Sequence, residues 1–76
     1  MIISMNEKEL ELLKKLAQKI KSRRLEINLS QEALANKCGF DRTYISLIET
    51  CKRNPSYLSL VKLCEGLEIE IRELLE

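Results

Sequence analysis

The sequence contains no histidine and only one proline and two glycines. Without histidine, and without a glycine-rich loop that could hold phosphates, it lacks the usual elements of an active site. No pair of carboxylates stands in a stretch apolar enough to sequester it. Catalysis is therefore the least expected function, and no cofactor is predicted.

Cysteine does not follow a metal-binding or disulfide pattern. The three cysteines are Cys38, Cys51 and Cys64, and an odd number does not fit a disulfide framework. No pair has Cys-x-x-Cys spacing, and a zinc site would need a carboxylate as its fourth ligand. We predict no metal site and three small, buried, reduced thiols. A role in redox or metal sensing is the alternative.

Long apolar runs are also missing. No stretch approaches the roughly 20 apolar residues that cross a bilayer. Residues 1–5 are too short and too uncharged for a secretory signal. We therefore expect a cytoplasmic protein with no membrane partner.

The residues that are present favour a small helical domain. Aromatic residues make up 4% and apolar residues 45% of the 76 positions, so the core must be mainly aliphatic. Leucine, isoleucine, lysine and glutamate dominate, which favours helices over strands. The length predicts a single domain, residues 1–76, near the size where one core is only just sufficient.

Charge is distributed unevenly along the chain, although the net charge is only +1. Residues 1–38 hold eight basic and five acidic residues, whereas residues 56–76 hold two basic and five acidic residues. A basic front and an acidic tail suit a nucleic-acid face at one end and a protein-facing or solvated tail at the other.

Capping residues and apolar periodicity predict five helices, at about 6–26, 30–38, 41–50, 56–67 and 70–76. Asn6 and Glu9 form an Asn-x-x-Glu capping box at the start of the first helix. Ser30 and Asp41 are the expected N-caps of the next two helices. Gly39 ends the second helix, because it tolerates the left-handed conformation common just past a C-terminus.

The expected helix at 41–50 has an unusual outward face. Its inward side carries Ile45 and Ile48. Its opposite side carries short hydroxyls, one leucine and one long cation, namely Thr43, Ser46, Leu47 and Thr50, with Arg42 at the leading edge. A merely solvated helix in a chain that is 33% charged would normally carry lysine or glutamate there.

The motif around this helix resembles a known family. Its residues are Ser30-Gln31-Glu32, Leu34-Ala35 and Gly39, then Tyr44-Ile45-Ser46 and Ile48-Glu49, then Lys52-Arg53-Asn54-Pro55-Ser56. This set resembles the helix-turn-helix of the phage repressor and Cro type. Within it, Asp41-Arg42-Thr43-Tyr44-Ile45-Ser46 resembles the controller proteins of restriction–modification systems. The resemblance extends over about residues 8–76.

The resemblance implies an all-α fold, a compact five-helix bundle that binds operator DNA as a two-fold dimer. The helix at 41–50 would enter the major groove, and the protein would regulate transcription of its own gene and of the nuclease gene. RNA polymerase is a further expected partner, recruited or blocked according to which site is filled. The alternative is an antitoxin or repressor-like protein-interaction module with the same fold, because a fold alone does not fix a function.

The resemblance assigns base reading to the start of this helix. Arg42 and Thr43 would read bases, with Ser46 and Leu47 nearby. Arginine is the commonest bidentate reader of guanine, threonine and leucine can contact thymine methyl groups, and serine can donate or accept. The alternative for Arg42 and Leu47 is an ordinary solvated surface position.

Residues flanking the reading helix are expected to hold the DNA backbone. Gln31 would contact phosphate at the start of the second helix, where free backbone N–H groups attract anions. Lys52, Arg53 and Asn54 would hold the backbone on the other side, or would form an ordinary polar loop. The hydroxyl of Tyr44 would reach a phosphate, or its ring would cover the core.

One ion pair and one departure from the family are expected to affect stability. Arg24 would pair with Glu49, since both lie at the edge of an apolar stripe where an unpaired charge is costly. Cys51 stands where the family usually has glycine. If the backbone there has a positive φ, a residue other than glycine costs about 1 kcal/mol.

Apolar residues beyond the needs of the core are candidates for a dimer contact. A domain of this size presents few DNA contacts, and two copies about 34–36 Å apart would read half-sites one helical turn apart. The expected contact residues are Leu58, Val61, Ile69, Ile71 and Leu75. The alternative is that some of them close the core of the monomer.

Overall fold

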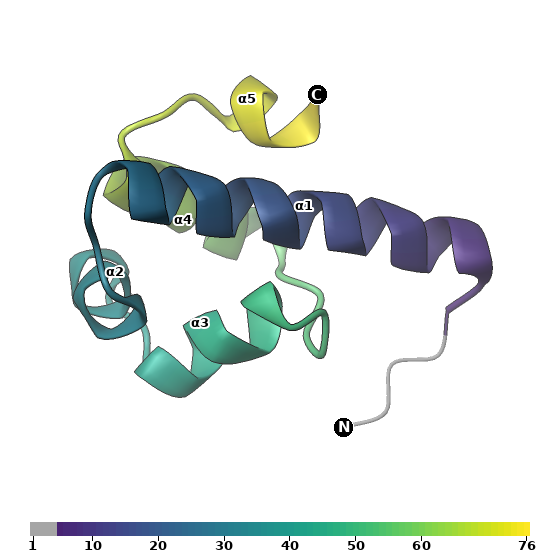
Figure 1. The fold of residues 1–76 in the computed structure, drawn as a ribbon, viewed down its shortest axis with the longest axis horizontal. Helices are drawn as coiled ribbons and strands as arrows, with labels where there is room; N and C mark the ends of the chain where they lie inside the picture. Colours follow the sequence, from purple (N-terminus) through teal and green to yellow (C-terminus); the bar gives the residue numbers. More distant parts are fainter. Residues whose placement is uncertain (1–4) are drawn as a thin grey trace.

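The computed structural model describes residues 5–76, which form five helices and no strand. The helices are α1 (Glu7–Glu26), α2 (Gln31–Cys38), α3 (Arg42–Glu49), α4 (Tyr57–Leu67) and α5 (Ile71–Leu75). The predicted all-α class is confirmed. Figure 1 shows α1 running across the molecule, with α5 on one side and α2 and α3 on the other. Every helix in this part of the chain is too short or too polar to cross a bilayer.

The helix starts follow the capping residues of the sequence, with one exception. Asn6 Oδ1 accepts a hydrogen bond from the amide of Glu9 at 2.8 Å, and the Asn6 amide donates to Glu9 Oε1 at 3.0 Å. Ser30 Oγ accepts from the amide of Ala33 at 3.0 Å. Asp41 occupies the N-cap position of α3, as predicted, but its side chain makes no capping hydrogen bond. The backbone of Asp41 is extended, and α3 begins after it without a side-chain cap.

Left-handed residues end the elements around the helix-turn-helix. Gly39 has a φ of 76° at the end of α2, as its lack of a Cβ predicted. Cys51 has a φ of 61° after α3, so the predicted strain at a residue other than glycine is present there. Glu68 ends α4 with a φ of 58°, a conformation that nothing in its side chain favours.

The core is aliphatic and lies where α1, α2, α3 and α4 meet. Its largest fully buried side chains are Ile20, Leu34, Ile45, Ile48, Leu63 and Leu67. At Gly66, helix α4 approaches α2 so closely that a Cβ would lie 2.5 Å from the sulfur of Cys38. Burial raises the pKa of the thiols of Cys38 and Cys64, which keeps both protonated at neutral pH. Cys51 is only half-buried, so the prediction of a buried thiol is wrong for this residue.

Candidate nucleic-acid interface

The reading face belongs to a helix that is anchored on its opposite side. The amide of Phe40 donates to the carbonyl of Ala35 at 2.8 Å, which closes the turn between α2 and α3. Ile45 and Ile48 are completely buried and fix the rotation of α3 about its axis. The side turned away from them carries the four predicted base-reading residues, Arg42, Thr43, Ser46 and Leu47.

These four side chains differ in solvent exposure. Arg42 and Thr43 are exposed, while Ser46 and Leu47 are half-buried. Within residues 5–76, Arg42 takes part in no ion pair. It borders a shallow hollow at the start of α2, together with Gln31, Glu32 and Asn36. A long cation with no internal partner, beside a helix N-terminus, is available to an anionic ligand or to a base edge.

Thr50 is exposed, as expected for the outward face, and its hydroxyl also closes the end of the reading helix. Its Oγ1 donates to the carbonyl of Ser46 at 2.8 Å. The amide of Lys52 donates to the carbonyl of Leu47 at 2.8 Å, which satisfies another carbonyl of the last turn. Among the four expected base readers, Arg42 and Thr43 in the first turn of α3 are the most accessible.

Arg24 and Glu49 form the expected ion pair, and its geometry is bidentate. Arg24 Nε lies 2.7 Å from Glu49 Oε2, and Arg24 Nη2 lies 2.9 Å from Oε1. A third donor, Nη1, reaches the carbonyl of Leu29 at 2.8 Å. The side chains of Arg24 and Glu49 are 8% and 3% exposed, and the hydrogen bond to Glu49 raises the pKa of Arg24. The pair ties α1 to the base of the reading helix.

Gln31 joins this network from α2. Its Nε2 donates to Glu49 Oε1 at 3.1 Å, so a single carboxylate connects α1, α2 and α3. The sequence did not indicate this contact, because Gln31 and Glu49 are 18 residues apart in the chain and lie on different helices. An amide nitrogen carries two protons, so the second proton of Gln31 can still serve a phosphate.

Tyr44 is part of the fold as well as of the edge of the face. Its hydroxyl donates to Ser59 Oγ at 2.8 Å, and its ring centroid lies 4.8 Å from that of Phe40. The ring therefore covers the core, as one of the two expectations had it. The guanidinium carbon of Arg53 lies 5.3 Å from the centre of the same ring, which holds this cation close to α3. A phosphate contact by Tyr44 stays a prediction.

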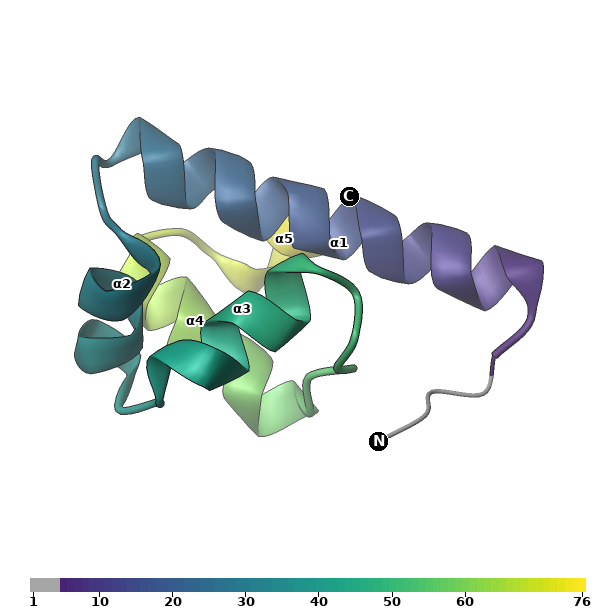
Figure 2. The ribbon, with the colours of Figure 1, turned by 60° about the horizontal axis from the view of Figure 1, so that its bottom comes forward.

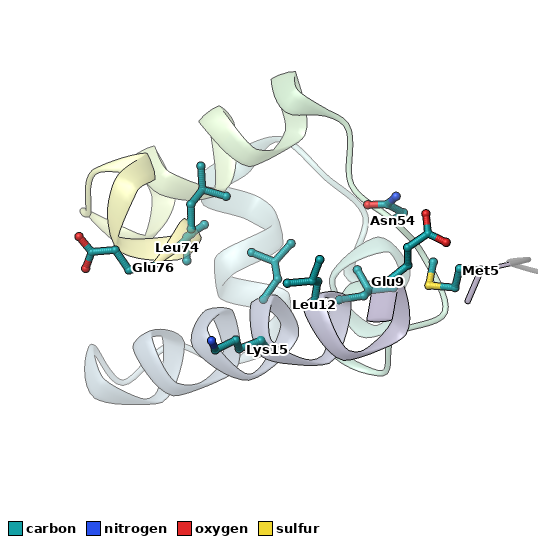
Figure 3. A pocket seen from close by; sticks show the side chains of 10 residues that line it. Met5, Glu9, Leu12, Lys15, Asn54, Leu74 and Glu76 are labelled. Atoms are coloured by element: carbon teal, nitrogen blue, oxygen red, sulfur yellow. The ribbon is translucent and has the colours of Figure 1, made fainter. Parts of the chain in front are cut away.

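The remaining loop residues are not all gathered at α3. Lys52, Arg53 and Asn54 are exposed. Asn54 lines a groove beside Met5 and Glu9 at the start of α1, as Figure 3 shows. Asn54 therefore lies within reach of α1 residues, and its predicted phosphate contact is the least supported of the three.

The five predicted dimer residues fall into two groups. Leu58 and Leu75 are 63% and 66% exposed. Ile69 and Ile71 are half-buried and pack against the core, so for them the alternative of closing the monomer holds. Val61 is half-buried and lines a shallow apolar hollow with both isoleucines.

Several structural residues were not indicated by the sequence. Arg23 Nε donates to the carbonyl of Leu67 at 2.9 Å and so holds the end of α4. Lys37 Nζ lies 3.0 Å from Glu68 Oε2, a contact that lowers the pKa of Glu68. Exposed apolar side chains were also missed, with Tyr57 at 73% and Leu12 at 58%. For Leu12 the available signal was its position beside the buried stripe of α1, which consists of Leu13, Ala17 and Ile20.

Comparison with known proteins shows which family has this sequence and fold. A helix-turn-helix family matches residues 20–74. The restriction-modification controller protein C.AhdI from Aeromonas hydrophila is 42% identical with a TM-score of 0.80, covering 82% of this chain and 94% of that one. The restriction-modification controller protein C.Esp1396I is 45% identical with a TM-score of 0.78, covering 84% and 86%. A hypothetical transcription factor from Neisseria, NHTF, is 30% identical with a TM-score of 0.84, covering 100% and 87%. No curated protein matches significantly.

Proposed function

Because this chain belongs to the helix-turn-helix controller proteins of restriction–modification systems, we propose that it is a sequence-specific transcriptional regulator that binds operator DNA as a dimer. The observation that carries the proposal is the exposed, almost uncharged face of α3, held in place by a buried ion pair. In this proposal the protein is cytoplasmic, where it binds DNA. Its role is regulatory, not catalytic.

Arg42 and Thr43 read bases in this proposal, with Ser46 and Leu47 beside them. Arg42 stands at the first position of α3 and is free of internal partners among the described residues, so it can extend into the major groove. A bidentate contact with guanine discriminates between bases by about 1–3 kcal/mol. The short hydroxyls next to it let the helix lie close to the base edges.

Phosphate contacts on either side of α3 fix its register on the duplex. Gln31 lies at the start of α2, and its link to Glu49 means that the same network orients the amide and the reading helix. Lys52 and Arg53 lie just past the end of α3, with Arg53 held over the ring of Tyr44. All of these contacts carry no sequence information, and those of Lys52 and Arg53 add affinity that falls with salt.

A dimer sets the spacing of the two reading helices, and half-sites one turn apart place them about 34–36 Å from each other. Occupancy then follows dimer concentration. Bound dimers would recruit or block RNA polymerase according to the half-sites that they fill.

The test is a titration of the protein against DNA from upstream of its own gene and against random DNA of the same length. Arg42→Ala should lose about 1–3 kcal/mol on the operator and little on random DNA. Lys52→Ala should weaken binding to both and reduce the slope of log affinity against log salt by about 1.

Equal losses on both DNAs from Arg42→Ala would overturn base reading by this residue. If the wild-type protein binds the upstream DNA no better than random DNA, the regulatory role is overturned. A protein-interaction module would then be the better-supported function.

A further inference from the structure

The two helices of the helix-turn-helix are joined at both of their ends. Figure 2 shows α2 and α3 lying together below α1. The turn at residues 39–41 joins the end of α2 to the start of α3. The hydrogen bond from Gln31 to Glu49 joins the opposite ends, because Gln31 is the first residue of α2 and Glu49 is the last residue of α3. A connection at each end fixes the angle between the two helices.

The start of α3, which carries Arg42, is less firmly held than its end. Asp41 occupies the N-cap position there, and its side chain makes no capping hydrogen bond. The eight residues of α3 span only about 12 Å, so a change of angle at Glu49 moves the whole reading face. Residues of a binding site need to be held within about 0.5 Å and 10–20° of their productive geometry. The bond between Gln31 and Glu49 therefore lies where it can set the position of Arg42.

The amide of Gln31 has one orientation in this network. A carboxylate only accepts hydrogen bonds, so the nitrogen of the amide, and not its oxygen, faces Glu49. Glu49 Oε1 also accepts from Arg24 Nη2 at 2.9 Å, and Oε2 accepts from Arg24 Nε at 2.7 Å. The carboxylate therefore keeps its ion pair when Gln31 is replaced, and no buried charge loses its partner. A substitution at Gln31 can test the helix angle without breaking the core.

We infer that Gln31 is a positioning residue for base reading, which fixes the angle between α2 and α3 and so contributes to operator selectivity as well as to affinity. The inference rests on the proposed function and extends it, since a phosphate contact alone carries no sequence information. Gln31 and Arg42 border the same hollow, so the residue that holds the angle and the residue that reads the base lie on one surface.

The test uses Gln31→Met, which keeps the length of the side chain and removes both of its hydrogen-bonding groups. Asn36→Ala is the matched control. Asn36 lies on the same helix and borders the same hollow, and its side chain makes no hydrogen bond to Glu49 in the described part of the chain. Binding of each variant of the full chain to the upstream DNA and to random DNA is measured by titration, with the melting temperature as the check on folding.

Gln31→Met is expected to reduce the ratio of operator affinity to random-DNA affinity about tenfold, because a hydrogen bond to a charged group is lost from the network that orients α3. Asn36→Ala should keep that ratio within about twofold of the wild type. When Arg42→Ala is already present, Gln31→Met should cost less operator affinity than it does alone, since both residues serve one reading contact. The melting temperature should fall less than in Glu49→Ala, because the ion pair stays intact.

Equal losses of affinity for both DNAs from Gln31→Met would overturn the inference and leave Gln31 as a phosphate contact only. Additive losses from Gln31→Met and Arg42→Ala would overturn it as well.

Failure of the proposed function is read separately, from a wild-type protein that does not prefer the upstream DNA. In that case residual dipolar couplings of the free protein decide, since they measure the angle between α2 and α3 without DNA. A changed angle in Gln31→Met supports the positioning role, and an unchanged angle overturns it.

Discussion

The two ends of α1 belong to one continuous helix but are held by different means. The back segment, which we define as residues 19–26, uses its polar side chains to hold other elements, with Arg23 on the end of α4 and Arg24 on Glu49 and Leu29. The front segment, residues 7–16, has a capping box at its own first turn and exposed leucines beyond it. Helical periodicity alone therefore does not distinguish a helix that builds the core from one that extends past it.

The largest effect should come from breaking the network at the back segment. Glu49→Ala leaves the guanidinium of Arg24 buried without its partner, and removal of one member of a buried pair costs about 3–5 kcal/mol. The free energy of unfolding in urea measures the loss. Glu26→Ala is the matched control, since it removes an exposed pair with Arg23 and should cost less than about 1 kcal/mol. Similar losses from the two variants would show that burial of the pair adds nothing.

A smaller effect should separate the two segments by their coupling to the core. Ser30→Ala removes the cap of α2 and should lower the free energy of global unfolding by about 1 kcal/mol. Asn6→Ala removes a similar cap from α1, but the front segment can fray without opening the core, so the global loss should be under about half as large. Amide hydrogen exchange in the first turns of α1 should speed up in the same variant. Both measurements are made at concentrations where the protein is monomeric.

Equal global losses from Ser30→Ala and Asn6→Ala would mean that the front segment unfolds together with the core. The contrast between the two segments would then be one of exposure only.

The smallest effect concerns strain inside the well-packed region. Cys51 has a positive φ, which costs a residue other than glycine about 1 kcal/mol. Cys51→Gly removes that strain but also makes the unfolded chain more flexible, so the melting temperature should stay the same or rise slightly. A clear fall would show that the half-buried cysteine side chain contributes packing that outweighs the strain.

Local patterns predicted most of the fold, and tertiary contacts explain what they missed. Asn6, Ser30 and Gly39 can be recognised in the sequence as helix boundaries, because the backbone groups at a helix end find their partners within a few residues. The pairing of Arg24 with Glu49 followed from two charges at the edges of apolar stripes. The link from Gln31 to the same carboxylate required knowledge of how α2 lies against α3, which no spacing in the chain contains.

The same limit applies to the surfaces. The expected base-reading residues share one helix face because Ile45 and Ile48 are buried on the other side, although only Arg42 and Thr43 are fully exposed. The groove between the start of α1 and α5 could not be predicted from the sequence, because the two helices are distant in the chain and adjacent only in the fold. Asp41 shows the reverse error, since a good capping residue at the right place makes no capping bond here.

The separation between the anchoring side and the outward side of α3 has an evolutionary consequence. Arg42 and Thr43 are exposed and take no part in the buried core, so substitutions at these two positions should change stability very little. A population of such proteins can therefore drift to new operator sequences without first acquiring compensating mutations in the core. A selection for altered operators that varies only these positions and Ser46 should yield folded proteins at high frequency.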